Sequence, residues 1–380
     1  MTSNLSQAGP DISCSRPTIG ILGGGQLARM LIQAGSPMGF GFVVLDPVVD
    51  SCSAQLAPQI IAEYDDHRAL TDFAEKVDVI TFDFENVPAS TLRFLNEYKP
   101  VFPGPEALEM SQDRLTEKQA LNHLGLTTAP YAAVDDISSL TVAAQTVGLP
   151  AILKTRRMGY DGKGQVIIRH MNELDQAFQS IHQHPAILEG FVDFDHEVSL
   201  IAVRTQQGQC EFYPLVENEH QHGILACSRM LKQHPLQQQA ERLGLRLLEH
   251  LDYVGVLTIE FFVCGQTLMV NEIAPRVHNS GHWSIEGAQP SQFENHLRAV
   301  CDLPITRPEI YAYSAMVNFI GQLPDPADLL SIPATHYHDY GKTPRVGRKV
   351  GHVTVCAENE ATLEHRLQQL RSVAAGDTRD

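Results

Sequence analysis

Residues 18–34, with the sequence TIGILGGGQLARMLIQA, decide the fold of the first part of the chain. A short apolar run is followed by three glycines and an amphipathic run, which predicts a strand, a tight turn and a helix. Two more apolar runs, 42–45 and 77–82, follow at intervals that leave room for helices between them. Short buried strands that alternate with helices predict a doubly wound α/β unit, whose ligands bind beyond the carboxyl ends of its parallel strands.

The composition predicts a globular chain of two or three domains. The chain has 380 residues, 43% hydrophobic and 19% charged, and domains run to about 100–150 residues. The 28 Lys and Arg residues against 45 Asp and Glu residues give a net charge of −17, which argues against nucleic acid as a partner. No run approaches the roughly 20 apolar residues of a membrane span. Seven scattered cysteines without a C-x-x-C pair favour a reduced, cytoplasmic location.

The first glycine loop, Gly23-Gly24-Gly25-Gln26-Leu27-Ala28, fits the dinucleotide-binding pattern G-x-G-x-x-G/A, and Asp46 ends the next strand about 20 residues later. Taken alone, this pattern indicates a nicotinamide-dependent oxidoreductase. The motif does not by itself specify a nicotinamide cofactor, because glycines and the start of a helix favour the binding of any phosphate group. The loop leaves three interpretations open: a nicotinamide site, a site for another phosphate ligand, or only a tight turn.

A second glycine loop, residues 159–165 with the sequence GYDGKGQ, lies between two expected strands. It is not a Walker A loop, because no G-K-[ST] sequence opens a helix here. Four cations lie within ten residues in a strongly acidic chain: Lys154, Arg156, Arg157 and Lys163. We expect this loop to close over a polyphosphate, and a solvated basic hairpin is the alternative.

Two acidic residues interrupt an otherwise apolar hairpin, which we expect to consist of strands at 256–263 and 268–273. If the turn is centred on Gln266, Glu260 and Glu272 face each other directly. Two carboxylates about 5 Å apart repel unless a cation lies between them, and oxygen ligands in this arrangement suit Mg²⁺ that carries a nucleotide phosphate. A β-bulge would shift the register and remove this pairing, and two exposed acids on an outer face are the alternative.

Polar and cationic residues follow Glu272 directly, in the run IAPRVHNSGHW at residues 273–283. Within it, Arg276, His278 and Asn279 are suited to hold a small oxyanion and to manage a proton. A lone His is usually structural, but a cluster of this kind beside the expected metal site predicts a reactive centre.

Two other groups of residues carry weaker signals. Arg345, Arg348 and Lys349, among glycines near the C-terminus, form a second candidate for binding an anion, and an ordinary basic loop is the alternative. Three His-x-His pairs begin at His182, His220 and His336. They lack nearby cysteines, and we expect no transition-metal site at any of them.

The order of the expected elements divides the chain into four parts: a flexible extension (1–17), a substrate domain (18–112), a nucleotide-binding domain (113–300) and a C-terminal domain (301–380). Within the third part, a small α+β unit is expected at about 130–216. Its elements are strands near 151–154, 165–169, 186–189 and 197–203 and a helix near 172–182. The other expected elements are helices near 113–124, 235–251, 291–300 and 361–372, and strands near 315–320 and 351–355.

Taken together, these motifs resemble the ATP-grasp enzymes, and among them the 5-(carboxyamino)imidazole ribonucleotide synthases of purine biosynthesis. The resemblance covers about residues 18–355, and its most specific segment runs from His278 to Trp283. Besides the two glycine loops, it is carried by Asp113-Arg114-Leu115-Thr116, Glu197-Val198-Ser199, Phe212-Tyr213-Pro214, Tyr253-Val254-Gly255-Val256, Asn271-Glu272 to Trp283, and Arg345-x-Gly347-Arg348-Lys349-x-Gly351-His352.

The resemblance implies an ATP-grasp fold of α/β and α+β type, with an N-terminal pre-ATP-grasp domain and a small β-rich C-terminal domain. It implies an ATP-dependent ligase that phosphorylates bicarbonate to carboxyphosphate. The carboxyl group then passes to the exocyclic amine of 5-aminoimidazole ribonucleotide, and ADP and phosphate are released. The expected cofactors are ATP and Mg²⁺, with Mn²⁺ as a substitute and without biotin. A cytoplasmic homodimer that passes its product to a mutase is also expected.

The functional residues of the family carry over to matching positions of this chain. The implied ATP ligands are Arg114, Lys154, Gly159, Tyr160, Asp161, Gly162, Lys163, Gly164, Gln165, Glu189, Gly190, Phe191, Val192, Glu197, His220, Asn271 and Glu272. Glu260 and Glu272 match the metal ligands. Arg276, His278 and Asn279 match the bicarbonate and carboxyphosphate group. Expected on the ribonucleotide side are Gln26, Glu85, Arg345 and Lys349.

Three other functions compete with this one. Another ATP-grasp ligase, such as a formate-using glycinamide ribonucleotide transformylase or a biotin-carboxylase-like protein, is disfavoured by the segment from His278 to Trp283. A nicotinamide dehydrogenase leaves Glu260, Glu272 and the second glycine loop without a role. A nucleotide sensor that binds ATP without chemistry does not need the cluster from Arg276 to His282.

Overall fold

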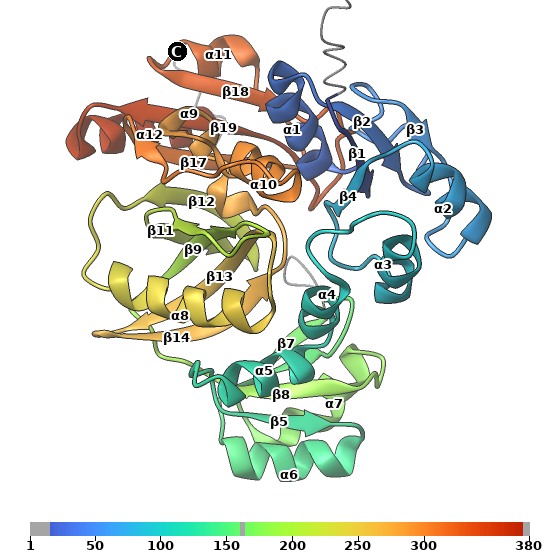
Figure 1. Cartoon of the computed structure of the whole chain (residues 1–380). Helices are drawn as coiled ribbons and strands as arrows, with labels where there is room; N and C mark the ends of the chain where they lie inside the picture. Colours follow the sequence, from blue (N-terminus) through green and yellow to red (C-terminus); the bar gives the residue numbers. More distant parts are fainter. Residues whose placement is uncertain (1–15, 160–163, 375–380) are drawn as a thin grey trace, which may run out of the picture.

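The computed structural model describes residues 16–159 and 164–374. The expectations for Tyr160, Asp161, Gly162 and Lys163, and for most of the first 17 residues, therefore lie outside the described residues. In Figure 1 the N-terminal unit lies beside the C-terminal strands at the top, the middle of the chain forms the large body below them, and a small unit lies at the bottom. Among the described residues, no helix is both long enough and apolar enough to cross a membrane.

The N-terminal unit is built on the strands β1 (Thr18–Leu22), β2 (Gly41–Leu45), β3 (Gln59–Ile60) and β4 (Val79–Phe82). Their order is β3-β2-β1-β4 and all the pairs are parallel. The helices of this unit are α1 (Gln26–Gly35), η1 (Ser36–Met38), α2 (His67–Ala74) and α3 (Ala89–Asn96). The parallel α/β unit expected from residues 18–34 is confirmed, and the turns after β1, β2 and β4 open at one edge of the sheet.

The small unit contains an antiparallel sheet of β5 (Tyr131–Val134), β6 (Ala151–Thr155), β7 (Gln165–Ile168) and β8 (Ala186–Gly190). The strand order is β5-β8-β6-β7. It packs with α6 (Ile137–Val147), η2 (Met171–Glu173) and α7 (Leu174–Ser180) around a buried cluster of its own. We call this unit, residues 131–190, the lid. The strand expected near 197–203 does not join it, because that strand pairs with β11 (Val216–Gln221) and β13 (Gly255–Cys264) of the large sheet instead.

The large sheet has nine strands: β9 (His196–Arg204), β10 (Cys210–Phe212), β11 (Val216–Gln221), β12 (Ile224–Met230), β13 (Gly255–Cys264), β14 (Thr267–Ala274), β17 (Tyr313–Ile320), β18 (Thr335–Asp339) and β19 (Lys349–Ala357). Their order is β14-β13-β9-β11-β12-β17-β19-β18, and β10 pairs with the C-terminal end of β9, at residues 202–204. The interior of β9 is buried on both faces, which suits the middle of a large sheet better than the small lid.

The C-terminal strands continue the large sheet, because β12 pairs with β17 at residues 227–229 and 315–317. The C-terminal part that we expected as a separate β-rich domain therefore shares its sheet with the middle of the chain. It still has its own buried cluster, to which α11 (Pro326–Leu330) and α12 (Glu360–Ala374) contribute apolar residues.

The remaining elements connect these sheets: α4 (Pro105–Gln112), α5 (Arg114–His123), α8 (Gln237–His250), η3 (Asn279–Gly281), α9 (Ser284–Gly287), β15 (Ala288–Gln289), α10 (Gln292–Val300) and β16 (Glu309–Ile310). Asp113 separates α4 from α5 with an extended backbone, and its carboxylate accepts hydrogen bonds from the backbone N–H groups of Leu115 and Thr116. This N-cap fixes the first turn of α5, which begins with Arg114.

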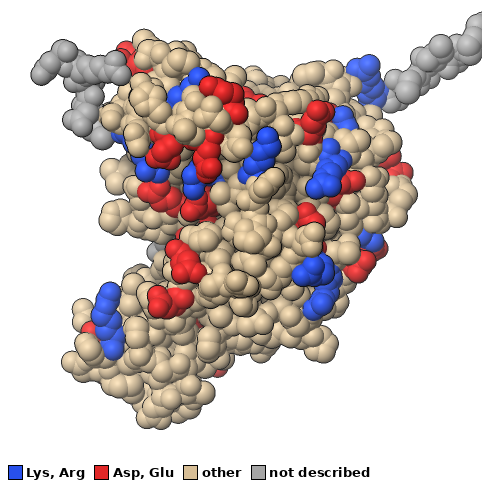
Figure 2. Space-filling view, turned by 90° about the vertical axis from the view of Figure 1, so that its left-hand side faces the viewer, with Lys and Arg blue, Asp and Glu red and all other residues tan. Residues whose placement is uncertain are grey.

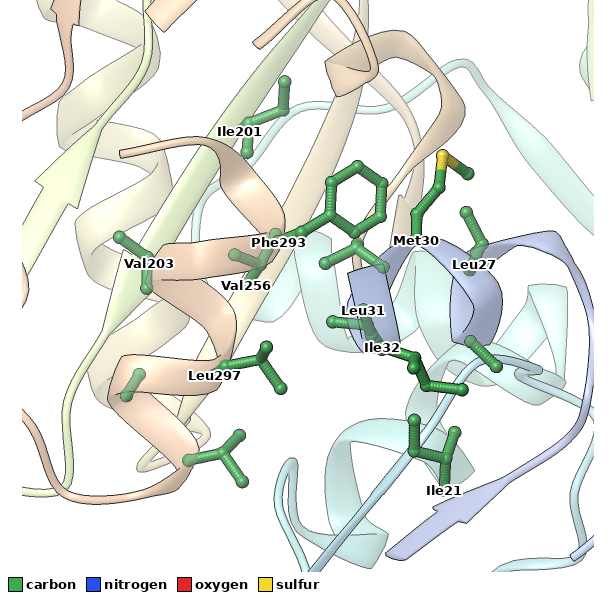
Figure 3. Packing of buried hydrophobic residues seen from close by; sticks show 14 of the residues in the cluster. Ile21, Leu27, Met30, Leu31, Ile32, Ile201, Val203, Val256, Phe293 and Leu297 are labelled. Atoms are coloured by element: carbon green, nitrogen blue, oxygen red, sulfur yellow. The ribbon is translucent and has the colours of Figure 1, made fainter. Parts of the chain in front are cut away.

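The N-terminal unit is joined to the large sheet by a shared hydrophobic core. Figure 3 shows Leu27 and Leu31 of α1 near Phe293 and Leu297 of α10, with Val256 of β13 behind them. Buried polar contacts reinforce this junction, because the imidazole of the buried His296 bonds the hydroxyl of Thr81 (2.9 Å) and accepts from the N–H of Val256 (3.0 Å). The N-terminal unit and the large sheet are therefore held together by one continuous core.

Candidate active site

A cavity of about 650 Å³ lies where the N-terminal unit, the lid, the large sheet and the C-terminal loops meet. Its walls come from segments 25–27, 83–86, 111–117, 156–159, 220–225, 260, 272–279 and 342–349. A site built from segments so far apart in the sequence exists only in the folded chain.

Twelve of the expected site residues line this cavity: Gln26, Glu85, Arg114, Gly159, His220, Glu260, Glu272, Arg276, His278, Asn279, Arg345 and Lys349. Nine others lie on neighbouring strands and loops without lining it: Lys154, Gly164, Gln165, Glu189, Gly190, Phe191, Val192, Glu197 and Asn271. The remaining four belong to the undescribed segment 160–163. The predicted residues therefore make up twelve of the thirty described residues that line the cavity, and the sequence did not separate wall residues from those behind the wall.

Glu260 and Glu272 face each other on the β13–β14 hairpin, as expected, but for a different reason. Cys264 pairs with Thr267, so the turn is centred between residues 265 and 266, half a residue earlier than we expected. A regular ladder that starts from this pair would place Glu260 opposite Asn271. A β-bulge restores the pairing, since Phe261 pairs with Val270 and Glu260 with Glu272, which leaves Asn271 as the extra residue. The bulge that was expected to remove the pairing is what creates it.

The two carboxyl groups have opposite electrostatic surroundings. Burial and the charge of Glu272 raise the pKa of Glu260 to about 7. Burial would raise the pKa of Glu272 as well, but the Arg114 guanidinium, 2.7 Å away, outweighs it and lowers the pKa to about 2. Burial opposes the charge of Arg114 too, yet Glu272 raises its pKa. Glu272 is thus ionised near pH 7, whereas Glu260 changes its protonation state near that pH, and a nearby cation would favour its ionised form.

The donor set of this pair suits a hard divalent cation. Both side chains offer only carboxylate oxygens, which Mg²⁺ prefers, and their mutual repulsion is relieved by a positive ion between them. Among the described residues, no three His, Cys, Asp or Glu side chains gather in a way that would hold a metal alone. A cation at Glu260 and Glu272 would therefore need further oxygens, such as those of a phosphate.

Three buried charged side chains lie where the lid meets α5. Lys154 on β6 approaches Glu189 on β8 (3.0 Å), and Lys118 on α5 approaches the same oxygen, Oε2 (3.3 Å). Burial would raise the pKa of Glu189, but the two lysines outweigh it and lower the pKa. Its other oxygen, Oε1, is buried without a hydrogen-bond partner among the described residues.

The lid also contacts the start of α5. Arg156 makes two-pronged contacts to the carboxylate of Asp113, with Nη2 2.9 Å and Nε 3.0 Å from its oxygens, and Arg114 donates to the carbonyl of Gly159 (3.4 Å). In the lid itself, the carbonyl of Gly164 accepts from the N–H of Thr155. Arg156 therefore makes a structural ion pair, and among the described members of the expected basic cluster it is the one that lines the cavity.

The segment after β8 shows where the chain leaves the lid. The N–H of Gly190 donates to Pro130 and the N–H of Phe191 donates to Pro150, while the Phe191 ring is 52% exposed. Farther along, Glu197 on β9 bonds Nδ1 of His220 on β11 (2.6 Å). Burial opposes protonation of His220, but Glu197 and nearby carboxylates outweigh it and raise its pKa.

The segment after β14 supplies two charged or titratable groups to the cavity wall, Arg276 and His278. Arg276 pairs with Glu85 of the N-terminal unit, and although burial opposes its charge, Glu85 raises its pKa. His278 lies between Glu260, 3.5 Å from its Nε2, and Ser280, whose hydroxyl is 2.8 Å from its Nδ1. Burial and the charge of Arg276 lower the pKa of His278 well below its usual range. His278 is therefore neutral near pH 7.

Asn279 has a more structural environment than we expected. Its side-chain amide exchanges two hydrogen bonds with that of Asn318 on β17, at 3.1 Å and 2.7 Å. Both polar atoms thus have partners within the protein, although the residue lines the cavity. The observed contacts fix the loop that carries His278.

The first glycine loop does not form a dinucleotide site. The carboxylate of Asp46, the residue that would bind a ribose, accepts hydrogen bonds from the N–H groups of Gly24 (2.6 Å) and Val48 (2.7 Å). Asp83 accepts from the N–H of Ala28 in the first turn of α1 (3.2 Å). Ser51 fills the space above Gly24, where even a Cβ atom would lie 2.1 Å from its hydroxyl. The protein's own carboxylates thus occupy part of the helix start that the motif offers to a phosphate.

Several residues of the site escaped the sequence analysis, among them Lys342, Glu117 and Lys118. Lys342 lines the cavity and donates to the amide oxygen of Gln26, and Glu117 and Lys118 lie one turn after Arg114 on α5. Residues three and four apart share one face of a helix. The spacing of Arg114, Glu117 and Lys118 was therefore a readable signal, whereas nothing in the sequence brings Lys342 to Gln26.

Family models match almost the whole chain. A ribonucleotide synthetase pre-ATP-grasp domain matches residues 17–112, an ATP-grasp domain matches residues 119–293, and a phosphoribosylaminoimidazole carboxylase C-terminal domain matches residues 314–366. The fold is therefore the ATP-grasp fold with the N-terminal and C-terminal domains of this family.

Curated relatives and solved structures match the chain over nearly their full length. The chain is 49% identical to the N5-carboxyaminoimidazole ribonucleotide synthase of Pseudomonas aeruginosa over 93% of this chain and 99% of that protein. The crystal structure of the synthetase from Thermus thermophilus has a TM-score of 0.89 at 48% identity and covers 93% and 98% of the two chains. That of the Aspergillus clavatus synthase with ADP and 5-aminoimidazole ribonucleotide has a TM-score of 0.88 at 29% identity and covers 95% and 99%. The chain belongs to the N5-carboxyaminoimidazole ribonucleotide synthase family of ATP-grasp ligases.

Proposed function

We propose that this chain carboxylates the exocyclic amine of 5-aminoimidazole ribonucleotide at the expense of ATP, as a step of purine biosynthesis. One observation carries the proposal: a single cavity brings the Glu260–Glu272 pair with Arg114 together with the Arg276–Glu85 pair. The first group suits a metal-bound phosphate and the second a small oxyanion beside an acceptor. Relatives named for this reaction, one of them solved with ADP and the ribonucleotide, support it.

We assign ATP to the side of the cavity where the lid meets α5 and the large sheet. Arg114 and Lys154 are placed to neutralise its phosphates, and the glycine loop 159–165 is expected to close over them and exclude water. The unpartnered oxygen of Glu189 supports a contact to a donor such as the adenine amino group. The Glu197 carboxylate is assigned to the ribose.

We assign Mg²⁺, or Mn²⁺ in its place, to Glu260 and Glu272, with the remaining ligands supplied by the nucleotide. When bound, the ion would offset negative charge on the phosphates as the γ-phosphoryl group is transferred. Arg114 keeps Glu272 ionised at physiological pH, and a cation held by the two residues would lower the pKa of Glu260 and favour its carboxylate form. No lysine-bearing biotinyl motif is present in the sequence, and we propose that no biotin takes part.

We assign bicarbonate to Arg276 and His278. One bicarbonate oxygen attacks the γ-phosphorus, the bond from that phosphorus to the bridging oxygen of ADP breaks, and carboxyphosphate forms. The substrate amine then attacks the carboxyl carbon, the C–O bond to phosphate breaks, and the nitrogen loses one proton. Arg276 stabilises the developing oxyanions, and the neutral His278 orients them by hydrogen bonding. Asn279, held by Asn318, keeps the loop in place.

We assign the ribonucleotide to the opposite side of the cavity, at Gln26, Glu85, Arg345 and Lys349, with Lys342 as an additional residue. This side carries cations from the C-terminal loop, which complement a phosphate. Glu85, paired with Arg276, is placed to bridge the ribonucleotide and the oxyanion. Such an arrangement would bring the amine next to the carboxyl group at the moment that carboxyphosphate forms.

The surface and the cysteines support the expected partners and location. On the face shown in Figure 2, Lys and Arg side chains of the described residues are interspersed with Asp and Glu, unlike the continuous basic surface of a nucleic-acid-binding protein. The six cysteines of the described part are free thiols, which suits a reduced cytoplasm. By resemblance to the family, we propose a homodimer that passes its product to a mutase, and light scattering tests the dimer.

The proposal is tested by ADP release with ATP, Mg²⁺ and bicarbonate, with and without 5-aminoimidazole ribonucleotide. We expect the ribonucleotide to stimulate ADP release, with one N5-carboxyaminoimidazole ribonucleotide formed for each ADP in rapid product analysis. Stimulation by formate and glycinamide ribonucleotide instead would identify a different ligase. Absorbance from bound NAD would contradict the structural role of Asp46.

A further inference from the structure

Two consecutive residues of α5 bind the backbone of β14 around the bulge residue Asn271. The ammonium of Lys118 donates to the carbonyl of Asn271 (2.9 Å), and a carboxylate oxygen of Glu117 accepts from the N–H of Ile273 (2.7 Å). Both side chains are almost fully buried, with Glu117 2% and Lys118 1% exposed. Between the two bonded backbone groups lies Glu272.

The location of β14 explains why these backbone groups need such partners. β14 is the edge strand of the large sheet, and the bulge interrupts the regular ladder to β13 at this point. A buried carbonyl or N–H group without a partner is destabilising, so a register shift persists only where its displaced groups are bonded elsewhere. Glu117 and Lys118 supply those bonds from outside the sheet.

The bulge decides the direction of the Glu272 side chain. In the unshifted register set by the Cys264–Thr267 turn, Glu260 would lie opposite Asn271 and Glu272 opposite Ile259. A shift of one residue moves a side chain to the other face of the sheet. Only the bulged register places both carboxylates on the cavity side, where Arg114 reaches Glu272.

We propose that Glu117 and Lys118 are positioning residues that hold this bulge and thereby set Glu272 opposite Glu260 as a site for a divalent cation. The inference rests on the metal site proposed above and deepens it. It assigns a role to two buried ionisable side chains that do not belong to the expected set of ligands. Lys118 also reaches Glu189 on β8, 3.3 Å away, so the same side chain connects the register of the metal strand with the lid.

A mere contribution of these residues to stability would have a different signature. If Glu117 and Lys118 only stabilise the fold, their removal lowers the free energy of unfolding and leaves cation affinity in the folded protein unchanged. If they hold the bulge, cation affinity falls in protein that is still folded. Binding of Mn²⁺ alone, followed by electron paramagnetic resonance, therefore separates the two roles without relying on catalytic activity.

The experiment uses the full chain and four variants. Glu117→Leu removes the acceptor of the Ile273 N–H, whereas Glu117→Gln keeps an acceptor oxygen of nearly the same shape. Lys118→Met removes the donor to Asn271 and keeps a similar apolar stem. The matched control is Gln237→Leu, because Gln237 also bridges backbone groups, those of Leu215 (2.8 Å) and Tyr213 (3.1 Å), but lies outside the cavity wall.

We expect Glu117→Leu and Lys118→Met to weaken Mn²⁺ binding by about tenfold or more, as removal of groups that orient metal ligands commonly does. Glu117→Gln should stay within about threefold of the unmodified protein, and Gln237→Leu should lower the unfolding temperature without changing Mn²⁺ affinity. Mn²⁺ affinities of Glu117→Leu and Lys118→Met equal to that of Gln237→Leu would overturn the inference. If Glu117→Leu does not fold, the comparison of Lys118→Met with Gln237→Leu decides.

Failure of the metal site itself would look different. Glu272→Gln, measured in the same way, should lose Mn²⁺ binding, because it removes a ligand charge without changing the backbone. If Glu272→Gln binds Mn²⁺ like the unmodified protein, the cation assignment is wrong. If Glu272→Gln loses binding while Glu117→Leu and Lys118→Met keep it, the assignment stands and only the inference about α5 fails.

Discussion

Two pairs of neighbouring acidic side chains have different partners in this protein. One pair is Asp46 and Asp83 of the N-terminal unit, and the other is Glu260 and Glu272 of the large sheet. The carboxylates of Asp46 and Asp83 accept hydrogen bonds from backbone N–H groups of Gly24, Val48 and Ala28. Those of Glu260 and Glu272 face each other across two strands, and Arg114 pairs with Glu272.

This difference separates carboxylates that stabilise the fold from carboxylates that we propose as ligands of a cation. A carboxylate that accepts hydrogen bonds from backbone N–H groups stabilises that part of the backbone. Few of its lone pairs then remain free to bind a ligand. In the second pair, Arg114 lowers the pKa of Glu272, whereas burial and the charge of Glu272 raise the pKa of Glu260, so a bound cation would favour the ionised form of Glu260. The partners of each carboxylate, rather than its motif, indicate its function.

The largest expected effect comes from breaking the second pair. Glu272→Ala should reduce ADP release about a thousandfold, because it removes one of two cation ligands and leaves Arg114 buried without its partner. The measurement is ADP release with ATP, Mg²⁺, bicarbonate and 5-aminoimidazole ribonucleotide, with thermal unfolding as a check of the fold. Unchanged ATP turnover in a folded variant would sink the metal assignment.

The next effect separates carboxyl transfer from nucleotide binding in the same cavity. Arg276→Ala should slow formation of the carboxylated product about a hundredfold, because it removes the cation next to Glu85 and His278. ADP affinity should remain within about twofold, since Arg276 lies away from the lid. Product formed per ADP released is the quantity to measure. A large loss of ADP affinity with an unchanged product ratio would contradict this role.

The pH dependence of stability tests the first pair. Burial, opposed by the N–H of Ala28 and reinforced by the charge of Asp46, raises the pKa of Asp83 to about 6. Asp83 therefore keeps its proton in the folded protein at pH values where the unfolded chain has lost it, and its contribution to stability falls as pH rises from about 4 to about 6.

Replacement of Asp83 by Asn isolates that contribution. Asp83→Asn keeps an acceptor for the N–H of Ala28 and removes the ionisation, so it should stabilise the fold by about 2 kcal/mol at pH 8 and by almost nothing at pH 4. Urea unfolding of both proteins at the two pH values measures the difference. An equal effect at pH 4 and pH 8 would show that ionisation of Asp83 is not involved.

The sequence predicted the elements of the fold better than their assembly. The apolar runs and glycines located β1, α1, α5 and α10 within a few residues, because their periodicity is local. The sequence did not predict that β9 belongs to the large sheet or that this sheet continues into the C-terminal strands. Both features depend on which strand edges are free to pair, and local sequence patterns do not specify this.

The candidate site shows the same limit at the scale of single residues. Glu260 and Glu272 were paired correctly from a turn placed half a residue too late, and a bulge at Asn271 compensated for that error. The glycine loop at Gly23 matched a dinucleotide pattern, yet Asp46 and Asp83 use its N–H groups within the protein. Spacing along a strand identifies candidates, but hydrogen-bond partners from distant segments decide which of them are available.

The smallest expected effect comes from Asp46, and it tests whether the first pair is structural. Asp46→Asn leaves one side-chain oxygen to serve the N–H groups of Gly24 and Val48, which should cost about 1–2 kcal/mol of unfolding free energy. Loss of its negative charge also relieves Asp83, which offsets part of that cost and brings the net effect to about 1 kcal/mol. Urea unfolding at pH 8 measures the loss, and ADP affinity and turnover should stay within about twofold. A large loss of nucleotide affinity with unchanged stability would mean that Asp46 binds a ligand, and the contrast between the two acidic pairs would then disappear.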